Sequence, residues 1–312
     1  MRKTPTWTML VAVTAALTLA ACVATEPEPA PPPAPQPPAP AVPEPTPKSA
    51  AATAYYARVQ AMLLSQGLLR TDGGSNIPFT DRMLAENFMR IALFDEYRRT
   101  DRGFVREETE GRLRRWEVPV RVGLRFGASV PADRQATDRS RIGSFVARLA
   151  TVTGHSITMD DANANFVIHI VSEDEREALG PKVRAVLPTL SQADLNGILN
   201  MPRSTYCLVY ALSEGNSGAY SRAVAVIRSE HPDLLRLSCV HEELAQGLGL
   251  PNDSPRARPS IFNDDEEFAF LTDHDELLLQ MLYSPELRPG MTADEARPIV
   301  FSLARRLMGG DS

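Results

Sequence analysis

The sequence predicts an α+β domain built on one twisted mixed sheet. Between residues 118 and 126, apolar and polar side chains alternate as they do in a half-buried strand. Three further strand-like runs follow, at 166–171, 206–212 and 222–228, and a helical pattern at 138–152 separates the first two strands. A helix-rich segment precedes this core, and loops and helices follow it, which is the order typical of an α+β fold.

Two helices are predicted before the sheet. Apolar residues at helical spacing run from Tyr55 to Leu63, and Gly67 ends the pattern. Thr80 is a typical N-cap for a second helix, whose apolar residues reach Phe94. This part therefore forms an N-terminal helical segment in front of the sheet.

Two more helices are predicted after the last strand. Asp233 is a candidate N-cap for a helix whose apolar stripe ends at Leu248. The run Thr272-Asp273-His274-Asp275 resembles a capping box in front of a helix that reaches Leu282.

The first 21 residues resemble a bacterial lipoprotein signal peptide. Arg2 and Lys3 precede an apolar stretch, 9–19, that is too short to span a bilayer comfortably. The stretch ends in Leu19-Ala20-Ala21-Cys22, which is similar to a lipobox. The resemblance implies a lipid on the Cys22 thiol, and the Val23 that follows implies sorting to the outer membrane, facing the periplasm. An ordinary secretory signal followed by a chance cysteine is the alternative.

Residues 22–50 are predicted to form a disordered stalk behind the lipidated cysteine. Of the 26 prolines in the chain, 12 lie between Pro27 and Pro47, where apolar residues are too few to build a core. Such a run favours polyproline II and reaches roughly 65 Å when extended. Its use as a proline-rich ligand for another protein is the alternative to a spacer.

Charge and cysteine content narrow the class of protein. The net charge is −6 and aromatic residues make up only 6%, so nucleic-acid binding has no support. With Cys22 lipidated, Cys207 and Cys239 remain in a compartment that oxidises thiols, and we predict that they form a disulfide. Two buried free thiols are the alternative.

The segment from 239 to 254 carries the chemistry. His241-Glu242 begins the zinc-protease pattern H-E-x-x-H, but Ala245 occupies the place of the second histidine. Shifted by one residue, the run Glu242-Glu243-x-x-Gln246-x-x-Gly249-x-x-Asn252 resembles the metzincin motif H-E-x-x-H-x-x-G-x-x-H. We expect His241 itself to be exposed, or to support the site from outside.

The resemblance implies a metzincin-like fold with an active-site-type helix. It assigns the general-base position to Glu243, the ligand positions to Glu242, Gln246 and Asn252, and the bend to Gly249. Downstream, Ser260-Ile261-Phe262-Asn263 resembles the matrixin turn beneath the metal, with Phe262 in the place of methionine. The domain 51–312 then divides into a helical part 51–115, a metzincin-like part 116–283 and a C-terminal helical tail 284–312.

All three zinc histidines are replaced, which points to a pseudo-protease. A carboxylate and two amides are poor zinc ligands, so we expect no metal and no cofactor. One alternative is a hard cation such as Ca²⁺ held by these oxygens, with Asp253 or Asp264 assisting. Another is that the three side chains hold a cleft together by hydrogen bonds, the amide of Gln246 donating to Glu242 one helical turn away.

A wider resemblance involves four segments of the chain. They are similar to secreted bacterial proteins of domain-of-unknown-function family 2927, over most of residues 55–299. The segments are Asn87–Ala92, Trp116–Val122, Glu242–Gln246 and Leu282–Met291. This resemblance implies no activity.

Taken together, the residues predict an outer-membrane lipoprotein whose periplasmic domain binds a peptide or protein. The peptide would lie in the cleft as an added strand along the sheet edge, as substrates of such proteases do. The alternative is a peptidase-like hydrolase in which Glu243 is the general base and an unusual oxygen-ligated metal is present.

Overall fold

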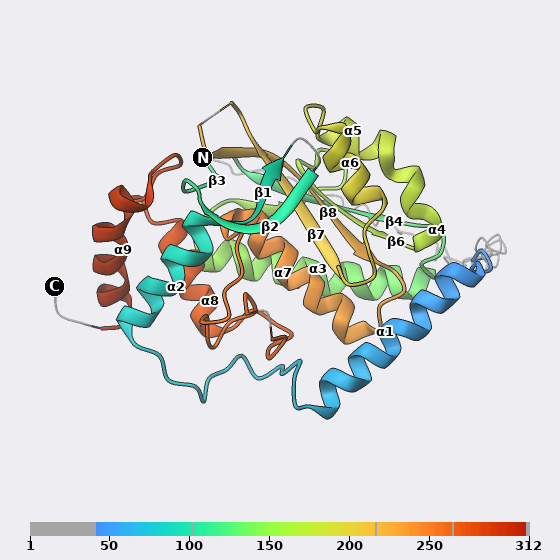
Figure 1. The fold of residues 1–312 in the computed structure, drawn as a ribbon, viewed down its shortest axis with the longest axis horizontal. Helices are drawn as coiled ribbons and strands as arrows, with labels where there is room; N and C mark the ends of the chain where they lie inside the picture. Colours follow the sequence, from blue (N-terminus) through green and yellow to red (C-terminus); the bar gives the residue numbers. More distant parts are fainter. Residues whose placement is uncertain (1–41, 101–102, 216, 264, 310–312) are drawn as a thin grey trace, which may run out of the picture. The chain divides into compact units, whose positions relative to one another are not determined.

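The computed structural model describes residues 42–100, 103–215, 217–263 and 265–309, all within one compact unit (Figure 1). The predicted signal peptide, Cys22 and most of the predicted stalk lie outside these residues. Within the described ranges, no helix is both long enough and apolar enough to cross a membrane.

A mostly parallel sheet forms the centre of the domain and confirms the α+β prediction. Its strand order is β3-β8-β6-β4-β5, with every neighbouring pair parallel. Strand β7 pairs with β8 in the antiparallel direction, which makes the sheet mixed as predicted. The strands are β3 (Arg115–Trp116), β4 (Val120–Phe126), β5 (Ile157–Met159), β6 (Phe166–Val171), β7 (Cys207–Ser213) and β8 (Ala219–Arg228).

Helices cover both faces of the sheet (Figure 1). On one face lie α3 (Ala132–Thr153) and α7 (Asp233–Gly249), and on the other α5 (Gly180–Val186) and α6 (Gln192–Leu199). Side-chain alternation along β8 explains this arrangement. Ala225 and Ile227 join the core shared with α3 and α7, whereas Val224 belongs to the smaller core beneath α5 and α6.

The remaining helices surround this core. Helix α2 packs against α9, and both contact α8. The short α4 and a 3-10 turn lead into α5. The bounds are α1 (Pro47–Ser65), α2 (Asp81–Leu93), α4 (Glu173–Arg176), the 3-10 turn (Glu177–Leu179), α8 (Asp273–Leu282) and α9 (Ala293–Leu307).

Local capping signals explain most of the helix starts. Thr80 accepts a hydrogen bond from the amide of Met83, and Thr272 forms a capping box with Asp275, both as predicted. Asp233, predicted as a cap, is instead the first residue of α7, and Pro232 occupies the cap position. A carboxylate in the first turn still favours the helix through its dipole.

Three parts of the chain differ from the prediction. The helical part also contains a hairpin of β1 (Phe94–Thr100) and β2 (Gly103–Glu110), which is rich in charged residues and lacks the alternation that marks a strand. Helix α1 begins at Pro47, inside the stretch assigned to the stalk, because Thr46 caps it. The helices between residues 173 and 199 are too short to show a clear period.

Candidate functional site

Helix α7 contains most of the segment 239–254, which resembles the metzincin motif. Its last residue, Gly249, has φ +127°, and a β-carbon there would lie 2.1 Å from the carbonyl oxygen of Arg114. The indole N–H of Trp116 donates to the carbonyl of Gly247 at 2.8 Å, and the Tyr283 hydroxyl donates to that of Leu248 at 3.0 Å. Gly249 therefore ends the helix in a backbone conformation that favours glycine, and its lack of a side chain lets the segment before β3 approach the helix end.

The predicted disulfide is confirmed. Cys207 and Cys239 are bonded, with their α-carbons 5.8 Å apart. The bond joins the first residue of β7 to α7, so the edge of the sheet and the motif helix are held at one fixed point. Cys239 is buried, and its Sγ lies 3.8 Å from Nδ1 of His231.

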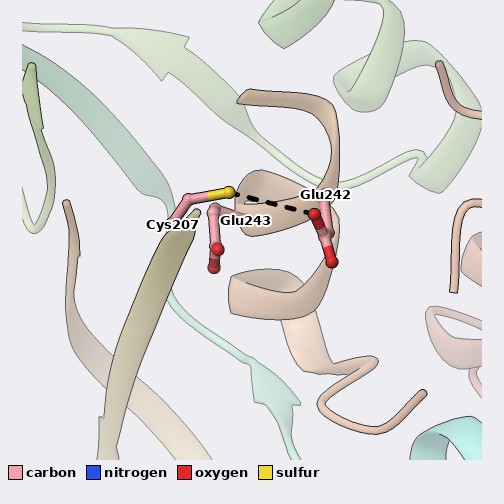
Figure 2. A group of neighbouring side chains, drawn as sticks. All are labelled: Cys207, Glu242 and Glu243. Atoms are coloured by element: carbon pink, nitrogen blue, oxygen red, sulfur yellow. Dashed lines mark hydrogen bonds between the residues drawn. The ribbon is translucent and has the colours of Figure 1, made fainter. Parts of the chain in front are cut away.

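Glu242 and Glu243 lie beside this disulfide (Figure 2). One carboxylate oxygen of each and Sγ of Cys207 are within 4.8 Å of one another, and Glu243 is only 3% exposed. The distance from Cys207 Sγ to Glu242 Oε2 is 3.9 Å. Because a disulfide sulfur carries no proton, this is a contact and not a hydrogen bond, and the sulfur is not a thiolate ligand either.

The two amides of the motif have other partners. Gln246 Nε2 donates to Asp253 Oδ1 at 3.2 Å, a partner other than the expected Glu242. Asn252 is 1% exposed, and its Nδ2 donates to the carbonyl of Arg90 at the end of α2. Both amides hold the turn after α7. Gln246 ties the helix to the turn at Asp253, and Asn252 ties the turn to α2.

The turn around Phe262 is held from α8. Ser260 Oγ donates to Asp275 Oδ1 at 2.5 Å, and the amide of Ile261 donates to Asp275 Oδ2 at 3.0 Å. Phe262 is fully buried in the core that also receives α7. Asp264, one of the proposed calcium ligands, lies outside the described residues.

His241 is a core residue, which corrects the expectation that it is exposed or supports the site. Its ring stacks on Phe145 with centroids 3.7 Å apart, and its Nδ1 accepts the amide N–H of Leu271. Burial, with a smaller contribution from Arg148, lowers its pKa to about 3, so the imidazole is neutral in the folded protein.

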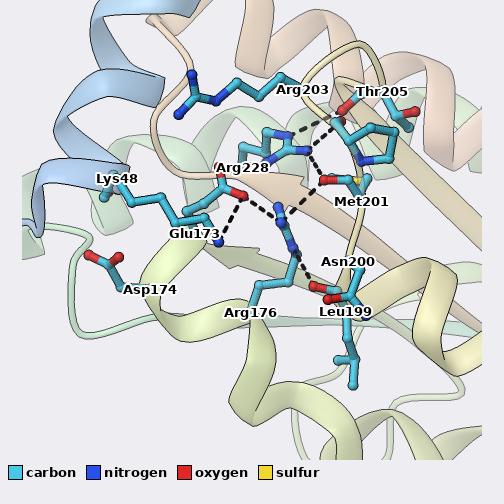
Figure 3. A network of polar contacts seen from close by, with 12 residues as sticks. Lys48, Glu173, Asp174, Arg176, Leu199, Asn200, Met201, Arg203, Thr205 and Arg228 are labelled. Carbon is cyan, nitrogen blue, oxygen red and sulfur yellow. Dashed lines mark hydrogen bonds and ion pairs between the residues drawn. The ribbon is translucent and has the colours of Figure 1, made fainter.

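A second polar cluster lies where α1 begins (Figure 3). Arg176 Nη2 donates to Glu173 Oε1 at 2.6 Å, and Lys48 of α1 lies 3.7 Å from the same carboxylate. Arg228 is 1% exposed and donates to backbone carbonyls at 201 and 202. Ser49 Oγ donates to buried Glu230 at 2.8 Å. These contacts attach α1 to the segments that follow β6 and β8. No motif in the sequence predicts them.

Strand β7 ends the sheet on one side. In the part of the chain that the structure describes, its only strand partner is β8. All seven residues, Cys207–Ser213, are half-buried, and none is charged or proline. The strand therefore keeps one row of backbone donors and acceptors that no other described strand satisfies.

A small cavity of 130 Å³ lies elsewhere and includes none of the motif residues. Arg115 and Tyr283 form two of its walls. The Arg115 guanidinium donates hydrogen bonds there to the Glu117 carboxylate and to the carbonyl oxygens of Leu282 and Ser284. The remaining lining residues are Trp116, Glu117, Thr153, Gly154 and His155.

Residues 81–302 match the family model described as "Protein of unknown function (DUF2927)". The chain belongs to the DUF2927 family. The match covers the sheet, α7 and the turn around Phe262, and it begins after α1. No curated protein and no solved structure matches the chain significantly. Membership of the DUF2927 family brings no known activity with it, so function must be argued from the site.

Proposed function

We propose that this DUF2927 domain binds an extended peptide or protein segment as an added strand on β7. The observation that carries the proposal is the uncharged edge of β7 beside the motif helix, with which no other described strand pairs. Proteins commonly protect sheet edges with charges, prolines or very short strands. Strand β7 has seven residues and uses neither charge nor proline.

The sides of β7 support the same proposal. Val209 and Ala211 pack toward the α7 core, and Leu208 and Tyr210 pack toward the core beneath α6. Both faces of the strand are thus held by the domain, and the disulfide fixes its first residue. A rigid edge loses little entropy when a partner strand pairs with it. In strand addition, main-chain hydrogen bonds supply affinity and alternate side chains supply specificity.

The experiment is a backbone-methylation scan of a bound peptide. An array of seven-residue apolar peptides yields a binder, which is then resynthesised with one N-methyl group at each position in turn. Strand addition predicts that methylation at every second residue weakens binding at least tenfold, because those amides donate to β7. Methylation at the intervening residues serves as the control and leaves the affinity nearly unchanged. Equal effects at all positions would contradict the proposal.

We further propose that a lipid on Cys22 holds the domain at the outer membrane, facing the periplasm. The support is the lipobox-like sequence in front of Cys22 and the proline-rich segment that follows it. Cells fed labelled palmitate should label the wild-type chain, and Cys22→Ser should abolish the label and release the protein into the soluble periplasmic fraction. Label that persists in Cys22→Ser would overturn this part of the proposal.

A hydrolase is the second candidate, and the carboxylate pair is the observation that favours it. Glu243 is buried beside Glu242, an arrangement in which one carboxylate can take a proton from water. The hydrolase proposal predicts that Glu243→Gln abolishes cleavage of a peptide library while Glu243→Asp keeps part of it. Binding that survives both changes, without any cleavage, favours the peptide-binding module. Calcium-dependent cleavage would favour the oxygen-ligated metal.

A further inference from the structure

We propose that Cys207, Glu242 and Glu243 form a binding site for a divalent transition metal, such as Zn²⁺, when the Cys207–Cys239 disulfide is opened. The site takes its ligands from two elements, the edge strand β7 and helix α7. It shares Glu242 with the ligand positions that the metzincin resemblance implied, but it does not include Gln246 or Asn252, which have other partners.

The spacing of the three donors fits one ion. A tetrahedral zinc ion with a Zn–S distance of ~2.3 Å and a Zn–O distance of ~2.0 Å separates the two ligands by about 3.5 Å. Cys207 Sγ and Glu242 Oε2 are 3.9 Å apart, and the group with Glu243 lies within 4.8 Å. The Cys207–Glu242 separation is thus within about 0.4 Å of the ideal value, and the half-buried Glu242 side chain has room to rotate.

Electrostatics also favour a cation in the reduced state. Once the Cys207 thiol gives up its proton to a bound metal, the thiolate and the two carboxylates together place their negative charge around one divalent ion. A sulfur donor among two oxygens selects a borderline-soft metal over Ca²⁺ or Mg²⁺, which prefer oxygen ligands alone. A fourth position remains for water, as in zinc sites that stay open.

The redox step is an ordinary disulfide exchange. A dithiol reductant supplies two electrons and two protons, the S–S bond breaks, and the reductant leaves as its own disulfide. Metal binding then displaces the proton from the Cys207 thiol. In the oxidised protein the same sulfur is bonded to Cys239, so the disulfide and the metal exclude each other.

The two sulfurs of the disulfide are not equivalent, which provides a matched control. Cys239 is 2% exposed, its Sγ lies 3.8 Å from Nδ1 of His231, and it is not part of the three-residue group. Cys239→Ser therefore frees the sulfur beside the carboxylates without any reductant. Cys207→Ser frees the sulfur beside His231 and breaks the same disulfide.

Cobalt titration of the full-length protein tests the proposal. Both variants carry Cys22→Ala as well, so that each contains one thiol, since the chain has three cysteines. Cys239→Ser should bind one cobalt ion per chain, give the near-ultraviolet thiolate-to-cobalt charge-transfer band, and release the cobalt to zinc. Cys207→Ser should give no such band. Glu242→Gln added to Cys239→Ser should weaken binding at least tenfold.

A second measurement tests the proposal without substitutions, in case the variants fold poorly. The protein with both native cysteines, treated with a phosphine reductant that does not bind metal, should gain the same band, and reoxidation should remove it. Circular dichroism confirms that each sample is folded before cobalt is added. Absence of the band in both folded Cys239→Ser and the reduced protein would overturn the proposal. So would bands of equal strength in Cys239→Ser and Cys207→Ser.

Discussion

Cys207 and Cys239 join the edge strand β7 to helix α7 through one covalent bond that spans 32 residues of sequence. The bond therefore connects β7, the strand that we propose pairs with a peptide, to the helix that carries Glu242 and Glu243. It also restricts the unfolded chain, which is the main way in which disulfides stabilise proteins.

The first prediction is the size of this stabilisation. Replacing both cysteines, as Cys207→Ser with Cys239→Ser, should lower the free energy of unfolding by about 3 kcal/mol, because the closed loop in the unfolded state is lost. Urea denaturation of the variant and of the oxidised wild type measures the difference. Reduced wild type is the control and should behave like the variant. An unchanged denaturation midpoint would contradict the prediction.

The second prediction tests the bend at the end of α7. Gly249→Ala should lower the free energy of unfolding by about 3 kcal/mol or more, because its β-carbon would lie 2.1 Å from the Arg114 carbonyl oxygen. Gly154→Ala is the matched control, with φ +64° and no atom within 4 Å of the added carbon. It should cost only about 1 kcal/mol. Equal losses in thermal unfolding would show that the close approach to Arg114 is unimportant.

The third prediction concerns acid. His241 has a folded pKa of about 3, lowered first by burial, against 6.5 for a free histidine. Between these values only the unfolded chain takes up the proton. Its contribution to stability is therefore complete above pH 6.5 and declines as the pH falls toward 3. His241→Asn keeps an acceptor for the Leu271 amide and removes the titration.

Unfolding free energies measured between pH 4 and 6 check this prediction. The slope for His241→Asn should be shallower than for wild type by about 1.4 kcal/mol per pH unit. Well above pH 6.5, where His241 is neutral in both states, the two slopes should coincide, which serves as the control. Identical slopes for wild type and His241→Asn would contradict the neutral, buried state of His241.

The fourth prediction is that α1 belongs to the folded domain although it precedes the family match. A chain that begins at residue 67 loses the Tyr56 ring, whose centroid lies 5.6 Å from the Arg228 guanidinium, and the hydrogen bond from Ser49 to Glu230. Compared with a chain that begins at residue 42, it should be less stable by at least about 3 kcal/mol, because buried charges lose partners. Differential scanning calorimetry compares the two chains. Equal melting temperatures would show that α1 is dispensable.

Local patterns explain what the sequence could predict. Strand β6 was expected at 166–171, the range observed, because every residue in it except His169 is apolar and polar residues bound the run. The capping box of α8 depends on Thr272 and Asp275 alone. The disulfide followed from the number of cysteines and the expected compartment.

Non-local contacts explain what it could not. Whether β7 is an edge or a central strand depends on its neighbours in the sheet and not on its own residues. Gln246 and Asn252 bond to Asp253 and to the end of α2, partners that a motif match does not reveal. His241 is buried because α3 packs on it through Phe145, and this contact joins distant parts of the chain.

The most direct test of the central claim, strand addition at β7, is hydrogen–deuterium exchange of the domain with and without a seven-residue peptide that it binds. Strand addition predicts slower exchange at alternate backbone amides between Leu208 and Ser213, which no other described strand protects. Slower exchange confined to the cavity beside Arg115 and Tyr283, with β7 unchanged, would contradict it.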